Sequence, residues 1–405
     1  MHAEPVAPES ARDDGPAGGG PRLEGRRIVF VLNWAHLGGA ERQAFLLARH
    51  LVSVEGASVT VCALTHQDGR GAELFREHGI PWQPVPVTWA GSQWEKIAGL
   101  QRLARRLRAM RPDVLLPYCT VPNVACGVVW KWTGASLCIW NQQDVNSPLA
   151  VSARAIERAV RGTPRFITNG AHVADYLAAF GAPRARVRVV HSALAPPAPR
   201  ESGAAWRTRL DIEEDDIVVC MVAHLHRYKD HETLLRAWRI ALDSARLDGR
   251  SLVLVLAGRA AGTEHALKAL AFDLELGRAV RFPGEVADVA GLIDAADAGA
   301  LSSRAEGCPN AVLEYMAAGL PVIGTDIPGI RECVGAGGVE LLAPPGDAQG
   351  LAEAIVRVAS DPVLRREHGE RNRQRARTTF SPERTLFVRT AIVAQELAAA
   401  GARRS

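Results

Sequence analysis

Two glutamates in the second half of the chain, Glu306 and Glu314, stand eight positions apart. Between them, Pro309 is placed to begin a helix, where its missing N–H costs nothing, and Gly319 is placed to end that helix. Asn310 and Glu314 then share one face of the helix at i, i+4 spacing. Carboxylate and amide groups beside the free N–H groups of a helix start suit hydroxyls and phosphates. The segment predicts a site for a ligand that carries both.

The residues around this segment predict a strand–loop–helix–strand unit of a parallel sheet. Residues 298–302 form one short apolar run before the loop, and residues 320–325 form another after the helix. Short apolar runs bounded by turn residues are typical of buried strands. Glu306 therefore lies in the loop at the carboxyl end of a strand, where open α/β sheets bind their ligands.

The rest of the chain alternates short apolar runs with longer helical stretches, which predicts an α/β protein in two halves. A segment with three prolines, residues 193–201, separates the halves and is read as a linker. The predicted strands are 27–33, 58–64, 114–118, 136–140, 165–169 and 187–191, then 217–223, 251–258 and 280–282. The predicted helices include 39–52, 230–245, 351–360 and 382–399.

The pattern resembles the retaining glycosyltransferases of GT-B fold, and specifically the family numbered 4 (glycosyl transferases group 1). The signature of that family is two glutamates separated by seven residues, as in Glu306 and Glu314. The resemblance covers about residues 26–385. It includes the runs LGGAER (37–42), YKDH (228–231), AAGLPV (317–322), PGIRE (328–332) and PPGD (344–347).

The resemblance implies two Rossmann-like βαβ domains that face each other across a cleft. A disordered tail (1–25) would precede an N-terminal acceptor-binding domain (26–195). A C-terminal nucleotide-sugar-binding domain (196–381) would follow. A last helix (382–405) would cross back onto the N-terminal domain.

The implied activity is transfer of a hexose from a nucleoside diphosphate sugar to an acceptor hydroxyl, with retention, in polysaccharide or glycolipid assembly. Glu306 would bind sugar hydroxyls and Glu314 the nucleotide ribose, while Lys229 would neutralise the leaving diphosphate, together with His224 or Arg227. The catalytic residues would be Lys229 and Glu306. Loop N–H groups would complete the donor site, at Gly38, Gly39, Gly307, Asn310 and Ala311.

Two departures from the family pattern stand out. The family usually has an arginine five positions before the lysine, where this chain has His224, so that Arg227 is the candidate substitute. Family members commonly carry a histidine at the carboxyl end of an N-domain strand, whereas the matching run WNQQD (140–144) has none. His36, His191 and His226 are interpreted as structural or peripheral.

These departures keep alternatives open. One is a degenerate nucleotide-sugar-binding protein without turnover. The other is a nucleotide-sugar epimerase or phosphorylase on the same architecture, against which the glutamate spacing and the Lys229-Asp230-His231 run argue.

Lys229 could also be an ordinary solvated lysine, and Gly38-Gly39 a tight turn without a ligand. The full G-x-G-x-x-G dinucleotide fingerprint is absent from the sequence. Glycine in this loop avoids a Cβ clash and permits a positive φ.

No cofactor and no metal is expected. Cleavage of a nucleotide sugar builds negative charge on the diphosphate, which a metal, cationic side chains or helix N-termini can stabilise. The sequence shows no Asp-x-Asp or similar paired carboxylates near the candidate cleft. Cationic side chains are therefore the simpler expectation.

Composition fits this interpretation. The 405 residues are 47% hydrophobic and 23% charged, as in an ordinary globular protein of two domains. The first 25 residues are rich in Pro, Gly and charge and have no apolar segment, so they are not read as a signal peptide. Seven scattered cysteines without a C-x-x-C predict buried thiols in a reducing cytoplasm, and neither a disulfide framework nor a zinc site.

Positive charge is concentrated in the first half. Residues 26–195 carry 20 Lys or Arg against 10 Asp or Glu, whereas residues 196–405 carry 26 against 29. Residues 96–111 hold six cations and no acids, with apolar residues at helical spacing. Such a helix can lie on the anionic inner surface of the membrane that bounds the cytoplasm. Alternatively, its charged side simply faces solvent while its apolar side packs on the core. Nucleic acid is not expected, because aromatic residues do not interleave with the arginines.

Overall fold

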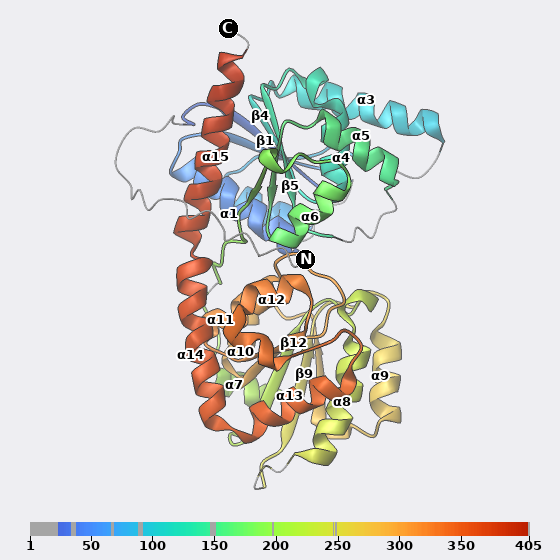
Figure 1. Cartoon of the computed structure of the whole chain (residues 1–405), viewed down its shortest axis with the longest axis vertical. Helices are drawn as coiled ribbons and strands as arrows, with labels where there is room; N and C mark the ends of the chain where they lie inside the picture. The colour runs from blue at the N-terminus through green and yellow to red at the C-terminus, as the bar shows by residue number, and fades with distance from the viewer. Residues whose placement is uncertain are drawn as a thin grey trace, which may run out of the picture.

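The computed structural model describes residues 23–33, 38–65, 69–87, 92–145, 151–196, 198–245, 247 and 249–403. Two parallel sheets, one above the other, form the centres of two domains, and helices cover their faces (Figure 1). This is the GT-B architecture of two Rossmann-like domains that the sequence predicts. The strands are short, and most of their residues are buried except at the edge strands β3, β7 and β10. The βαβ crossovers place helices on both faces.

The N-terminal domain contains a seven-stranded sheet in the order β3-β2-β1-β4-β5-β6-β7. The strands are β1 (Arg27–Leu32), β2 (Ser58–Ala63), β3 (Trp82–Pro84), β4 (Val114–Pro117), β5 (Leu137–Gln142), β6 (Arg165–Thr168) and β7 (Val187–Val189). The helices are α1 (Gly39–Ser53), α2 (Arg70–Glu77), α3 (Gln93–Ala109), α4 (Thr120–Thr133), α5 (Ala153–Gly162) and α6 (Ala171–Ala179).

The C-terminal domain contains a six-stranded sheet in the order β10-β9-β8-β11-β12-β13. The strands are β8 (Ile217–Val222), β9 (Leu252–Ala257), β10 (Val280–Gly284), β11 (Ala298–Leu301), β12 (Val322–Thr325) and β13 (Leu342–Ala343). The helices are α7 (Gly203–Arg209), α8 (His231–Ser244), α9 (Glu264–Asp273), α10 (Val289–Asp294), α11 (Asn310–Ala318), α12 (Pro328–Val334) and α13 (Ala348–Ser360).

Two consecutive helices, α14 (Pro362–Thr379) and α15 (Pro382–Ala402), run along the side of both domains (Figure 1). In α14, Asn372 donates to the carbonyl of Leu320 at 2.8 Å, which fixes the end of α11. In α15, Val393 is fully buried in the core of the N-terminal domain, and Arg389 donates to the carbonyl of Val190 at 2.8 Å. The chain therefore returns from the second domain to the first, as the resemblance implies.

Three sequence expectations need correction. Pro309 is not the first residue of its helix but precedes it, because its ψ of 118° is extended and α11 starts at Asn310. Leu23, assigned to the disordered tail, is 1% exposed and packs in the N-terminal core, while residues 1–22 lie outside the described residues. Strands β3 and β13 were not predicted, because three and two residues are too short to show a periodicity.

The predicted end of the signature helix is confirmed. Gly319 has a φ of +76°, in the left-handed region that glycine adopts without strain, and α11 stops there. On the same helix, the Tyr315 hydroxyl accepts the N–H of Val222 at 2.7 Å and so holds α11 against the end of β8. The loop before α11 and the loop after β8 are thereby fixed relative to each other.

Among the described residues, no helix is long and apolar enough to cross a bilayer.

Candidate active site

A pocket of about 330 Å³ lies between the two domains, at the carboxyl ends of strands from both sheets. The N-terminal domain contributes the start of α1 and the loops after β5, β6 and β7. The C-terminal domain contributes the loops after β8, β9 and β10, and the Glu306–Glu314 segment. Most of the predicted donor-binding residues line this pocket: Gly38, Gly39, His224, Lys229, Glu306, Gly307, Asn310, Ala311 and Glu314. Arg227 is exposed and does not belong to the pocket wall.

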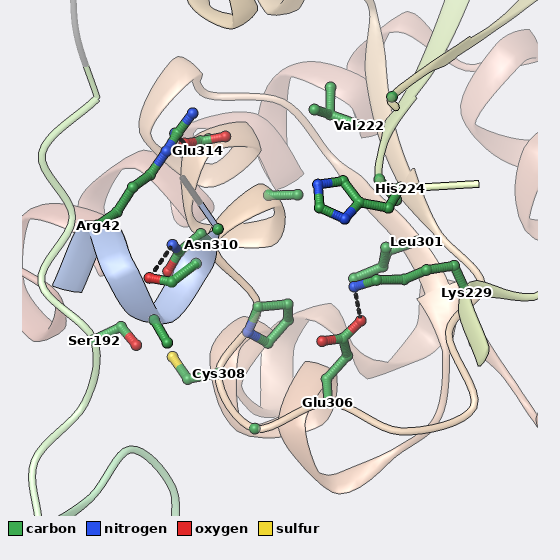
Figure 2. A pocket seen from close by; sticks show the side chains of 18 of the residues that line it. Arg42, Ser192, Val222, His224, Lys229, Leu301, Glu306, Cys308, Asn310 and Glu314 are labelled. Carbon is green, nitrogen blue, oxygen red and sulfur yellow. Dashed lines mark hydrogen bonds and ion pairs between the residues drawn. The ribbon is translucent and has the colours of Figure 1, made fainter. Parts of the chain in front are cut away.

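Lys229 and Glu306 form an ion pair inside the pocket (Figure 2). Their side chains are only 14% and 12% exposed, and Ser303 donates to the same Glu306 oxygen at 2.6 Å. Burial opposes the charge of Lys229, but the Glu306 carboxylate and Tyr228 outweigh it, so that the pKa of Lys229 is raised. Lys229 is therefore a fixed cation rather than a solvated lysine.

The loop that carries Lys229 is held by a buried network. Asp230 has a φ of +50° and is 5% exposed, and its carboxylate accepts from Thr233 at 2.9 Å and Arg304 at 3.0 Å. Ser302, at the end of β11, donates to the carbonyls of Lys229 and Asp230, both at 3.0 Å. Because these contacts fix the backbone on both sides, the ammonium group is positioned before any ligand arrives.

Glu314 lies at the other end of the pocket and pairs with the N-terminal domain (Figure 2). Its carboxylate is 11% exposed and lies 3.0 Å from the Arg42 guanidinium of α1. Burial raises the pKa of Glu314, and the charge of Arg42 opposes that rise. Beside this pair, Asn310 donates to the carbonyl of Gly39 at 3.3 Å and accepts from Gln43 at 3.4 Å. The starts of α11 and α1 therefore touch across the cleft.

Glycines allow this close approach. A Cβ on Gly307 would lie 2.3 Å from the carbonyl oxygen of Gln143, and one on Gly39 would lie 3.3 Å from Asn310 Nδ2. Gly38 has a φ of −103°, so the expected positive φ is not used there. Instead, its N–H donates to the Glu41 carboxylate at 3.2 Å.

On the side of the pocket formed by the N-terminal domain, two amide side chains have polar atoms without a partner among the described residues. These are Gln143 Nε2 and Asn169 Oδ1, and both residues line the pocket. Asp144 also lines it and accepts from Gln142 at 2.7 Å. Amides and a carboxylate can hydrogen-bond the hydroxyls of a sugar. The sequence analysis assigned no role to these residues. Its only signals were the place of Gln143 and Asp144 in the run without the family histidine, and of Asn169 at the end of a predicted strand.

Of the histidines interpreted as structural or peripheral, His191 and His226 do not line the pocket. His226 accepts the N–H of Tyr228 and caps the short turn before Lys229. His191 and His172 flank Glu332 of α12, whose carboxylate accepts the N–H of Ala171 at 3.1 Å. These contacts join the two domains at a second point. His36 lies outside the described residues.

Two partly buried carboxylates near the pocket have raised pKa values. Burial, reinforced by the charge of Asp144, raises the pKa of Glu41 from 4.5 to about 7. Burial also raises the pKa of Asp144 to about 6. Both groups keep a proton in the folded chain at pH values where the unfolded chain has lost it.

We expect Glu41→Gln to abolish part of the pH dependence of stability. Between the unfolded pKa of 4.5 and the folded pKa of about 7, raising the pH favours the unfolded chain, since only that chain releases this proton. The wild type should therefore lose up to about 3 kcal/mol relative to Glu41→Gln by neutral pH. Urea unfolding of both proteins at several pH values measures this difference. The exposed Glu367→Gln serves as the control, and a pH-independent difference for Glu41→Gln would contradict the prediction.

No three His, Cys, Asp or Glu side chains gather in a way that could hold a metal ion within the described ranges.

Comparison with known proteins identifies two family models. Residues 203–375 match the model described as glycosyl transferases group 1, and residues 37–195 match the model described as glycosyltransferase family 4. A lipopolysaccharide core biosynthesis glycosyltransferase, LpsE of Rhizobium meliloti, is 33% identical over 180 residues, which are 44% of this chain and 50% of LpsE. A D-inositol 3-phosphate glycosyltransferase of Saccharomonospora viridis is 30% identical over 183 residues, 42% of each protein. The chain thus spans about half the length of the curated relatives it matches.

Two solved structures share the fold. Anabaena HepE, crystallised with UDP and glucose, superposes with a TM-score of 0.76 at 20% identity, over 92% of this chain and 99% of HepE. WaaG, a glycosyltransferase involved in lipopolysaccharide biosynthesis, superposes with a TM-score of 0.66 at 18% identity, over 89% of this chain and 99% of WaaG.

Proposed function

The chain belongs to the GT-B glycosyltransferases of family 4, and from this premise we propose that it moves a sugar from a nucleoside diphosphate sugar to an acceptor hydroxyl, with retention. The observation that carries the proposal is the interdomain pocket with the Lys229–Glu306 pair at one end and Glu314 at the other. The sugar would lie near Glu306, the diphosphate near Lys229 and the ribose near Glu314.

In the proposed reaction, the bond between the anomeric carbon and the diphosphate oxygen breaks, and a bond to the acceptor oxygen forms on the same face. The acceptor proton passes to an oxygen of the departing phosphate. Lys229 and the N–H groups at the start of α11 would stabilise the charge that grows on that phosphate, without a metal ion. Gln143 and Asn169, each with a polar atom that has no partner among the described residues, would orient the acceptor.

The names of the relatives point to the acceptor class. LpsE and WaaG act in lipopolysaccharide assembly, as their names state. We propose an acceptor from polysaccharide or glycolipid assembly, in lipid-linked or polymeric form. A protein that binds the nucleotide sugar without turnover is the alternative. Its motivation is the absence of the family histidine after β5 and of the family arginine, where this chain has His224.

The deciding experiment incubates the protein with UDP-, GDP- and ADP-sugars, with and without extracts of membrane lipids and polysaccharides as acceptors. We expect one donor to release its nucleoside diphosphate faster when an acceptor is present. Binding of a donor without release of nucleotide would support the alternative. A thermal-shift screen with the free nucleotides chooses the donor, because a ligand of the native state raises its melting temperature.

We further propose that α3 holds the enzyme on the cytoplasmic surface of an anionic membrane. Arg102, Arg105 and Arg106 are exposed on this helix, and Trp94 and Ile97 near its start are 79% and 44% exposed. Figure 1 shows the helix at the outer edge of the N-terminal domain, extending to its side. Exposed aromatic and apolar residues beside arginines fit the interface of a bilayer.

Neutralising these three arginines to Gln should weaken binding to phosphatidylglycerol liposomes at low salt by tenfold or more, since each cation near an anionic surface is worth about 1 kcal/mol. Liposome co-sedimentation measures the effect. The matched control changes three exposed arginines elsewhere, Arg366, Arg377 and Arg384. Equal binding by the two triple variants would show that α3 is only a solvated face.

A further inference from the structure

Three cations line the pocket, and they differ in their partners. Arg42 pairs with Glu314, and Lys229 pairs with Glu306. Arg259, which follows β9, has no side-chain hydrogen bond or ion pair within the part of the chain that the structure describes. An unpaired guanidinium on a pocket wall leaves positive charge available to an anionic ligand.

The register of the sheet places Arg259 beside His224. Val222 is opposite Ala257 in the ladder between β8 and β9, and Leu225 is opposite Ala260 in the bridge that extends it. Between these two pairs, His224 therefore stands opposite Arg259. Opposite residues of neighbouring strands lie about 4.8 Å apart, and their side chains emerge from the same face of the sheet. Both side chains line the pocket.

The backbone that carries Arg259 is rigid. The N–H of Leu225 donates to the carbonyl of Arg259 at 3.0 Å. One residue earlier, a Cβ on Gly258 would lie 1.9 Å from the carbonyl oxygen of Ala223, so the two strand ends are in direct contact. The base of the arginine side chain is thus fixed, while its exposed end is free to reach a ligand.

His224 does not supply a charge at this point. Burial, reinforced by the positive charges of Arg259 and Lys229, lowers the pKa of His224, so the imidazole is neutral at neutral pH. Glu285, on the next loop, also lines the pocket, but it forms no ion pair with Arg259 in the described structure. The guanidinium of Arg259 is therefore the available cation at the ends of β8 and β9.

We propose that Arg259 binds the diphosphate of the nucleotide sugar and acts as the second cation beside Lys229. The inference rests on the proposed function and adds a residue to the same site. It replaces Arg227, which the sequence analysis gave as the candidate substitute for the family arginine. Arg227 does not line the pocket. It belongs to the short turn Arg227–Lys229, in which Lys229 is the cation that faces the pocket.

Calorimetric binding of UDP, GDP and ADP, each beside its nucleoside, tests the proposal. Arg259→Ala should weaken binding of the preferred diphosphate by about 10- to 100-fold, the cost of one hydrogen bond between charged groups, and leave the nucleoside unaffected. Arg227→Ala is the matched control and should change affinity by less than about threefold, as an exposed charge does.

A double variant tests whether a guanidinium at the neighbouring position of the ladder can replace that of Arg259. Adding His224→Arg to Arg259→Ala returns a guanidinium to the opposite residue of the ladder, and we expect it to recover most of the lost affinity. Unchanged diphosphate affinity in Arg259→Ala, or an equal loss for the nucleoside, would overturn the role of Arg259 and leave the proposed function standing. Failure of the wild type to bind any of the three diphosphates would overturn both.

Discussion

Lys229→Ala is expected to lower the turnover number of sugar transfer by about 10²- to 10³-fold, the usual effect of removing one preorganised group that stabilises transition-state charge. The ammonium group is in place before the donor binds, because Ser302 and Asp230 fix its backbone and Glu306 fixes its end. A group that needs no reorganisation acts most strongly where charge develops, here on the departing phosphate.

The measurement is the initial rate of nucleoside diphosphate release in the presence of acceptor, at saturating donor. Lys268→Ala removes an exposed lysine of α9 that pairs with Glu264 on the same helix, and it should leave the rate unchanged. Because we assign the charge stabilisation to Lys229 and helix N–H groups, excess EDTA should keep the wild-type rate within about twofold. Loss of activity on chelation, with recovery on addition of Mn²⁺, would show that the cationic side chains of the protein do not suffice to stabilise the departing diphosphate.

The parts of the fold that sequence predicted well are those whose signals are local. The helix Asn310–Ala318 is bounded by Pro309 and Gly319, and the strands on either side are continuous apolar runs. The structure has all three within two residues of the expected bounds. Local signals of this kind need no knowledge of the remainder of the chain.

The contacts that complete the site are distant in sequence and could not be read from it. Arg42 and Glu314 are separated by 272 positions, and only the meeting of the two domains brings them together. The choice between Arg227 and Arg259 depends on the direction of a short turn and on the register between two strands. The family pattern left Arg227 as the candidate substitute for the missing arginine, whereas the sheet brings Arg259 to the pocket wall.

Glu314→Ala should weaken binding of the nucleotide itself by about 10- to 100-fold, since a hydrogen bond to a charged group is worth about 1.5–3 kcal/mol. If Glu314 holds the ribose, the nucleoside should lose as much affinity as the nucleoside diphosphate. Glu306→Ala, by contrast, should leave nucleotide affinity nearly intact and lower the rate of transfer, because Glu306 is assigned to the sugar. Calorimetry with the preferred nucleoside diphosphate and its nucleoside, followed by rate measurements, separates the two roles.

The ion pairs of the two glutamates set the controls for this comparison. Glu314 also pairs with Arg42 of the other domain, so its removal could act by loosening the cleft. Arg42→Ala breaks the same pair but keeps the carboxylate, and it should preserve most of the affinity for the nucleoside. Equal losses in Arg42→Ala and Glu314→Ala would assign the effect to contact between the domains. Removing Glu306 also leaves Lys229 without its partner and available to the diphosphate, so the nucleotide should not lose affinity. A loss of nucleotide affinity in Glu306→Ala as large as that in Glu314→Ala would therefore contradict the division of roles between the two glutamates.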